Sequence, residues 1–198
     1  TIPASLVDLT ANAYTITASA GGSINIASNN ITMNGLTFTA DTTQSSSLIN
    51  IGTTIGTTSN ISNCFFDKMN AGVLNNQGNV NLIGVTIADS KGELSTSIIN
   101  NTNGTMNIQG GTYSDNTGTN GGVVSVSGGI VSLSDAAQFN HNTASNNGGA
   151  FYTEGAGNLY ATGVANIEHN SAQNGGGIYH SGGLMWFQDG SKVTISDN

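Results

Sequence analysis

Three glycine pairs recur in the second half of the chain at an even spacing of 27 residues, at Gly121-Gly122, Gly148-Gly149 and Gly175-Gly176. An apolar residue stands two positions after each pair, and steps of 25 residues backwards from the first of these meet further apolar residues. Repeats of this length are typical of solenoids, because each unit needs its neighbours to bury its apolar face. The column aligned in this way contains Ile24, Ile49, Leu74, Ile99, Val124, Phe151 and Ile178.

Two further sets of apolar residues recur in each unit, and the units are 21 to 30 residues long. Around each set, apolar and small polar residues alternate with a period of two, which is typical of β-strands. We align the second set as Ile31, Ile61, Val80, Met106, Val131, Leu159 and Met185, with Met33, Asn63, Leu82, Ile108, Leu133, Ala161 and Phe187 two positions later. The third set contains Ile16, Phe38, Phe66, Ile87, Tyr113, Phe139, Ile167 and Ile195.

Three short strands in each repeat predict an all-β fold, a right-handed parallel β-helix (solenoid) of about seven coils. A β-sandwich competes with this prediction, but its strands would recur every 8–12 residues or so and would not keep one residue type in each column. We expect residues 1–198 to form a single domain. The first residue is Thr1 rather than methionine, so we interpret the chain as a piece of a longer protein.

The composition excludes several classes of function. The chain has three Lys and Arg together against 11 Asp and Glu, and its formal net charge is −8. Too little positive charge is available to bind the phosphates of a nucleic acid, so no nucleic-acid partner is expected. No apolar run is long enough for a transmembrane helix, so this segment is not expected to insert into a membrane. A single cysteine, Cys64, excludes an intrachain disulfide and is predicted to be a buried apolar residue.

One outward column is the first candidate for a binding surface. It follows the Ile24 column by one residue and reads Asn25, Asn50, Asn75, Asn100, Ser125, Tyr152 and Tyr179. Stacked asparagines are expected to form an amide ladder along the solenoid. Tyr152 and Tyr179 replace that ladder near the C-terminus, where two stacked rings would either offer a platform to a sugar or a protein or simply support packing between coils.

A histidine column is the second candidate. It reads Asp115, His141, His169 and Asp197, and the next residue in each coil is an asparagine: Asn116, Asn142, Asn170 and Asn198. We assign the asparagines to structure, because an asparagine at a strand end bonds the backbone of the turn. The histidines have three alternative roles: a metal site, a pH-sensitive pair or a solvated edge. Two imidazoles without a clear third ligand do not define a metal site, so no metal and no cofactor are predicted.

Catalytic residues are not evident in the sequence. The three lysines lie on different coils, so they could not together neutralise the carboxylate of a uronate substrate. Asp135 and Asp189 share a column two coils apart, which the spacing of carboxylates in an inverting glycosidase would allow. Both, however, occupy a turn position that glycine otherwise fills, and we interpret them as turn residues. We therefore predict that the protein is not an enzyme.

Residues 106–198 contain a recognisable pair of motifs. Phe139-Asn140-His141-Asn142 matches an F-x-x-N motif, and Gly148-Gly149-Ala150-Phe151 matches a G-G-A-(apolar) motif. The pair recurs as Ile167 to Asn170 followed by Gly175-Gly176-Gly177-Ile178. This arrangement resembles the repeats of the chlamydial polymorphic outer membrane proteins and of related secreted β-helical surface proteins.

The resemblance implies an autotransporter passenger domain that acts in adhesion, with Phe139, Asn142, Gly148, Gly149 and Ala150 as the matching motif positions. The alternation predicts instead that Phe139 faces inward and that the glycine pair makes a turn, so the motif would affect binding through the fold. We expect a cell-surface, non-enzymatic adhesin, held at the outer membrane by a segment outside this sequence, with a host cell-surface protein or glycan as its partner. The alternatives are a structural protein that associates end to end and a polysaccharide-active enzyme.

Overall fold

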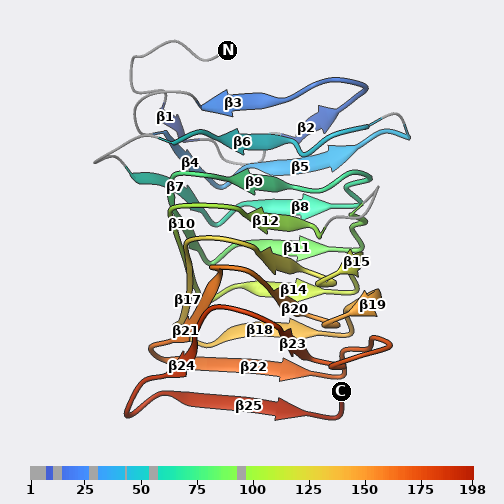
Figure 1. Cartoon of the computed structure of the whole chain (residues 1–198). Helices are drawn as coiled ribbons and strands as arrows, with labels where there is room; N and C mark the ends of the chain where they lie inside the picture. The colour runs from blue at the N-terminus through green and yellow to red at the C-terminus, as the bar shows by residue number, and fades with distance from the viewer. Residues whose placement is uncertain (1–7, 11–14, 27–30, 43, 54–57, 93–96) are drawn as a thin grey trace.

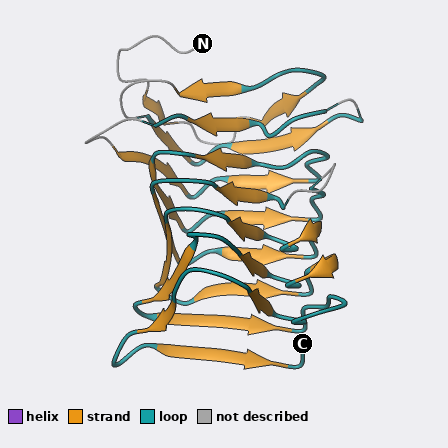
Figure 2. Ribbon diagram, in the orientation of Figure 1, coloured by secondary structure: helices purple, strands orange, loops and turns teal. Residues whose placement is uncertain are grey.

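The computed structural model describes residues 8–10, 15–26, 31–42, 44–53, 58–92 and 97–198. These residues form an elongated stack of strands with the first described strands at one end and the C-terminus at the other (Figure 1). Strands and connecting loops account for the whole of this described part, without a helix (Figure 2). It therefore contains no helix that is long and apolar enough to cross a membrane.

Three long sheets, named A, B and C here, contain most of the strands, and every strand pairs in parallel with the equivalent strand of the next coil. Sheet A contains β1 (Asp8–Thr10), β4 (Thr32–Asn34), β7 (Thr58–Ser62), β10 (Asn79–Ile83), β13 (Thr105–Gln109), β17 (Ile130–Ser134), β21 (Asn158–Ala161) and β24 (Met185–Phe187). Sheet B contains β2 (Thr15–Ala18), β5 (Thr37–Ala40), β8 (Phe65–Asp67), β11 (Thr86–Ala88), β14 (Thr112–Ser114), β18 (Ala137–Asn140), β22 (Val164–Glu168) and β25 (Lys192–Ser196). Sheet C contains β3 (Ile24–Ile26), β6 (Ile49–Ile51), β9 (Leu74–Asn76), β12 (Ile99–Asn101), β16 (Val124–Val126), β20 (Phe151–Thr153) and β23 (Ile178–His180).

The predicted parallel β-helix is confirmed, and the prediction of about seven coils is close, since the described residues give sheets of eight, eight and seven strands. The Ile24 column is correct at every step of sheet C, from Ile24 opposite Ile49 to Phe151 opposite Ile178. The column from Ile16 to Ile195 is likewise correct along sheet B.

Our alignment of the sheet A column was wrong in one coil. Ile61 lies opposite Met33 and Leu82, not opposite Val80. The position opposite Val80 belongs to Ser59, a polar residue that is nonetheless buried. Its hydroxyl accepts a hydrogen bond from the Ile31 backbone N–H (3.4 Å). The buried hydroxyl thus has the hydrogen-bond partner that a buried polar group needs. Asn63, which we had placed beside Leu82, instead occupies a turn with a φ of 51°.

One continuous core of inward side chains follows the axis of the stack. Like residues stack on like between successive coils: Phe38 lies parallel to Phe66 with ring centroids 4.8 Å apart, and Tyr113 lies parallel to Phe139 at 4.7 Å. Cys64 is buried in this core, as predicted, and burial raises the pKa of its thiol. Stacking of this kind gives each short strand the apolar contacts that it cannot make within its own coil.

A fourth, small sheet lies at the corner between sheets B and C. There, β15 (Thr117–Asn120) and β19 (Thr143–Asn147) pair in parallel. Isolated bridges extend this corner from Lys91 to Thr117 and from Thr143 to Ser171. The corner is therefore hydrogen-bonded between coils in the same way as the three long sheets.

Candidate functional site

The two tyrosines singled out from the sequence are stacked on the outward side of sheet C. Tyr152 of β20 lies opposite Tyr179 of β23 in the strand register. Their ring centroids are 5.7 Å apart and their planes differ by 16°. Both side chains are partly exposed, so the pair presents aromatic surface to solvent.

A carboxylate lies against this ring pair. The hydroxyl of Tyr152 donates a hydrogen bond of 2.7 Å to Oε2 of Glu154, which is exposed in the turn after β20. The hydrogen bond to Glu154 raises the pKa of Tyr152, because it stabilises the protonated phenol. A ring whose hydroxyl is already oriented by a carboxylate offers both an apolar face and a fixed polar edge to a ligand.

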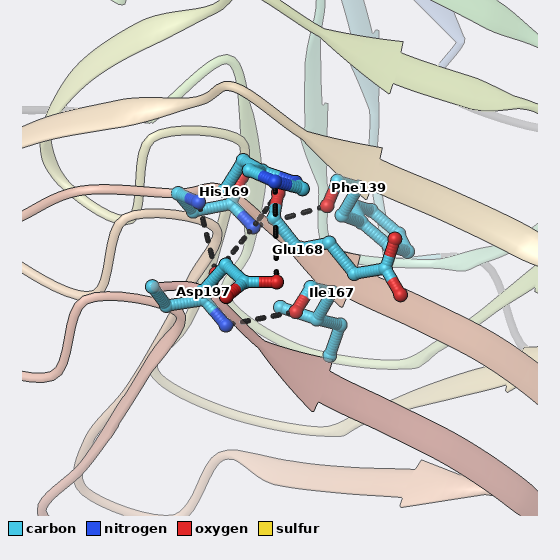
Figure 3. A network of polar contacts seen from close by, with 7 residues as sticks. Phe139, Ile167, Glu168, His169 and Asp197 are labelled. Carbon is cyan, nitrogen blue, oxygen red and sulfur yellow. Dashed lines mark hydrogen bonds and ion pairs between the residues drawn. The ribbon is translucent and has the colours of Figure 1, made fainter.

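The two histidines stack on one another at the edge where sheet B ends. His141 and His169 have ring centroids 5.2 Å apart with their planes within 8°. Nε2 of His169 lies 3.9 Å from Oδ2 of Asp197 in the next coil, a contact visible in Figure 3. Among the described residues, no group of three or more His, Cys, Asp and Glu side chains is placed to hold a metal ion.

The backbone explains why these positions form a column. His141 and His169 have φ angles of 55° and 56°, and the equivalent residues of neighbouring coils are also left-handed: Lys68, Asp89, Asp115 and Asp197. Such a backbone favours Asn, Asp and Gly, and it turns the chain sharply at the end of the sheet B strands from β8 to β25. In these coils the position therefore has a turn function, whichever side chain occupies it.

The asparagines that follow form a buried hydrogen-bonded ladder, as we had assigned them. The Asn142 side chain donates to the Tyr113 carbonyl (2.8 Å) and to Oδ1 of Asn170 (2.9 Å), while its own Oδ1 accepts from the Asn116 backbone N–H (3.1 Å). Asn170 repeats this pattern with the Phe139 carbonyl and with Asn198. The amides thus join each coil to the two beside it, and they are sealed from solvent up to Asn170.

The residues of the F-x-x-N and G-G-A motifs lie inside the solenoid or in its turns. Phe139, Asn142 and Ala150 are fully buried. A Cβ on Gly149 would lie 1.9 Å from the carbonyl oxygen of Gly176 in the next coil, so only glycine fits at this close contact between the two backbones. The preceding glycines, Gly121, Gly148 and Gly175, have φ angles of 74°, 63° and 59°.

Two further motif glycines lie against Asn198. A Cβ on Gly176 would meet the Asn198 backbone at 2.6 Å, and one on Gly177 would meet its side chain at 3.0 Å. The motif positions thus belong to turns and core, as the alternation predicted. The buried positions Phe139, Asn142 and Ala150 could affect a binding partner only through the fold, whereas Gly175 is exposed.

No family model, curated protein or solved structure matches this chain. The structure shows the architecture alone, a parallel β-solenoid. The likeness to the chlamydial surface-protein repeats rests on the motifs quoted above.

The carboxylates considered for hydrolysis do not form an organised pair. Asp135 has a φ of 55° in the turn before β18, and its Oδ2 accepts a hydrogen bond from the neighbouring Ser134 hydroxyl (3.2 Å). Asp189 lies in the turn after β24, next to Gly190. Both residues are exposed turn residues, which agrees with our structural interpretation of them.

Two asparagine ladders were missed in the sequence. Asn174 donates to Asn147 (3.0 Å) and Asn147 donates to Asn120 (2.9 Å), and each precedes a glycine pair. Asn107 donates to Asn81 (2.9 Å) and Asn81 to Asn60 (2.8 Å) on the outward side of sheet A. The recurring Asn-Gly-Gly triplet would have revealed the first ladder. The second was hidden by the misplacement of Ile61.

Proposed function

We propose that this chain is a non-enzymatic adhesion module of a cell-surface protein and that it attaches to a protein or glycan of a host surface. The observation that supports this proposal is the outward tyrosine pair, Tyr152 and Tyr179, which replaces the asparagines of the same column. Among those asparagines, Asn50 bonds to Asn25, but Asn100 bonds to Ser97 of its own coil. An asparagine ladder stabilises the stack by hydrogen bonds, whereas two partly exposed rings contribute surface that a ligand can cover. A rigid scaffold beneath the rings reduces the entropy lost when a partner binds.

The same column provides the test. Replacing Tyr152 and Tyr179 with serine removes both rings, and serine already occupies this column at Ser125. We expect the double variant to keep its far-ultraviolet circular dichroism and its unfolding midpoint but to lose attachment to host cells in flow cytometry.

The matched control carries serine at Asn75 and Asn100, in the same column and sheet. This control should attach as the unaltered protein does. Adhesion through the tyrosine pair is wrong if the unaltered protein attaches to no host surface, or if the double tyrosine variant attaches equally well.

A further inference from the structure

The outward side of sheet A, from β4 to β24, is a second surface with a chemistry of its own. Its side chains alternate with the buried ones along each strand, as in β7 and β13. Its central column reads Thr32, Asn60, Asn81, Asn107, Ser132, Tyr160 and Trp186 in the strand register. The same succession of amides, then serine, then aromatic rings occurs at the same coils on sheet C, so two faces change character together.

Charged residues are absent from this outward face within the described strands β4 to β24. The columns beside the central one contain Asn79, Thr105, Ile130, Asn158 and Leu184 on one side and Ser62, Ile83, Gln109, Ser134, Thr162 and Gln188 on the other. Sheet B, in contrast, carries Asp67, Glu168 and Lys192. A face without charge, on a chain of net charge −8, offers nothing to a polyanion and only weak attraction to a cation.

The aromatic end of the central column is exposed. Trp186 is 54% exposed and is one of the most exposed large apolar side chains in the described residues. Its ring meets that of Tyr160 edge to face, with centroids 5.8 Å apart and planes at 87°. The indole is thus largely exposed while it packs against the ring beside it.

The amides of the column retain unused hydrogen-bonding groups. In the ladder, Asn81 donates one N–H to Asn60 and accepts one bond from Asn107. A carboxamide has two N–H donors and two lone pairs on oxygen, so each ladder member keeps a donor and an acceptor for another partner. Because parallel strands are spaced by about 4.8 Å, these groups repeat at a fixed interval along the axis of the solenoid.

We propose that this face binds an extended, neutral polysaccharide that lies along the central column of sheet A. One sugar ring stacks its C–H face on Trp186, beside which Tyr160 stands at a right angle, and the hydroxyl groups of the following sugars exchange hydrogen bonds with the ladder of Asn107, Asn81 and Asn60. A sugar hydroxyl both donates and accepts, which suits the unused groups of an amide. A protein partner fits less well, because protein interfaces need a packed apolar centre, whereas along this face the apolar side chains Ile83 and Ile130 stand apart from the exposed Leu184 and Trp186.

This site goes beyond the adhesion proposal, since it lies on another sheet and uses other residues. The experiment exploits the fact that Trp186 is the single tryptophan of the chain. Its fluorescence therefore reports on this site alone. Titration with cellohexaose and with chitohexaose is expected to give a saturable change in emission for at least one of the two, and the corresponding disaccharide should bind roughly tenfold or more weakly because it spans fewer coils.

Variants assign the binding to this face. Measured by calorimetry, Trp186→Ser should lose about tenfold or more in affinity, whereas Trp186→Phe should stay within a few-fold, because a phenyl ring still stacks. Phe65→Ser removes a ring of 38% exposure from sheet B and should leave the affinity unchanged. Hexagalacturonate, a polyanion of similar length, should not bind.

Three results would overturn the proposal: no change in emission with either neutral oligosaccharide, equal affinity of Trp186→Ser, or equal binding of hexagalacturonate. The double serine variant at Tyr152 and Tyr179 separates this proposal from the adhesion proposal. It should titrate with the oligosaccharide normally even though it loses attachment to cells.

Discussion

The coils up to residue 109 and the coils from residue 112 onwards share one interior but differ in where their amides stack. In the N-terminal region the outward columns of sheets C and A carry amides, as in Asn25 with Asn50 and in Asn81 with Asn107, and one further pair, Asn76 with Asn101, is buried. In the C-terminal region a buried ladder in the turn after sheet B joins Asn116, Asn142 and Asn170, and a partly exposed one runs from Asn120 to Asn174. In this region the outward columns of sheets A and C carry serine and then aromatic rings in place of asparagine.

The largest loss of stability is expected where the backbones of neighbouring coils in the C-terminal region lie closest together. Gly149→Ala would place a methyl group 1.9 Å from one backbone oxygen and 2.5 Å from a backbone nitrogen, so a whole coil would have to move. We expect a loss of about 4 kcal/mol or more in the free energy of unfolding, measured with urea. Gly190→Ala is the control, since nothing lies within 4 Å of its Cβ and only its φ of 85° is strained; it should cost about 1–2 kcal/mol.

A direct comparison of the two regions comes from deleting one amide in each. Asn142→Ala leaves the Tyr113 carbonyl and the Asn116 backbone N–H without these buried partners, at a cost of about 3 kcal/mol or more. Asn81→Ala removes a partly exposed ladder member, whose neighbours can bond to water instead, and should cost less than about 1 kcal/mol. Equal losses in urea unfolding would show that the two ladders do not differ in energy.

One substitution in the C-terminal core, at Tyr113, is expected to stabilise the protein. The Tyr113 hydroxyl is buried without a hydrogen-bond partner, and its burial raises the pKa of Tyr113 above the ordinary value. Tyr113→Phe removes the unsatisfied group but keeps the stacking on Phe139, so we expect a gain of about 1 kcal/mol.

The same substitution predicts a dependence on pH. Because the pKa of Tyr113 is higher in the folded chain than in the unfolded one, the unfolded chain alone releases this proton as the pH rises above about 10. Unfolding then becomes easier with rising pH, and the contribution of Tyr113 is fully present only below that range. Chemical denaturation at several alkaline pH values should show a steeper loss in the unaltered protein than in Tyr113→Phe. Parallel curves would contradict this assignment.

The smallest effect concerns the rings on the outside. Glu154→Gln removes the carboxylate that accepts the Tyr152 hydrogen bond. The pKa of Tyr152 should therefore fall towards its ordinary value, while the stability should stay within about 0.5 kcal/mol. Ultraviolet titration of tyrosinate, compared with that of Glu154→Gln, measures the change as a difference between the two curves. Identical curves would remove Glu154 from the account of this surface.

The fold could be predicted because the interior repeats its side-chain types. The column from Ile24 to Ile178 is aliphatic or aromatic in every coil, and its register was predicted without error. In the one misplaced coil a polar residue, Ser59, stands where the neighbouring coils have the apolar residues Ile31 and Val80. Ser59 lies 28 residues after Ile31 but only 21 before Val80, so the spacing is uneven as well. Hydrophobic alternation fixes register only where the inward residues are hydrophobic.

The outward surfaces could be predicted only in part. Tyr152 and Tyr179 followed directly from a correct column, whereas Tyr160 and Trp186 were missed even though Leu159 and Met185 beside them were aligned correctly. The positive φ of His141 and His169 was also not predicted, although histidine, like Asn and Asp, is enriched in this region of the backbone map. Burial restricts which side chains can point inward, but no such restriction acts on side chains that face solvent. Their roles depend on contacts that an alignment of repeats does not show.

The buried amide ladder also gives the solenoid a direction. The turn of the coil at Asn116 is completed by Asn142, which comes 26 residues later, and that of Asn142 by Asn170, 28 residues later. When the stack grows towards its C-terminus, the turn of the last folded coil therefore lacks these hydrogen bonds until the next coil has folded. Each coil of this region is thus stabilised by the coil that follows it in the sequence.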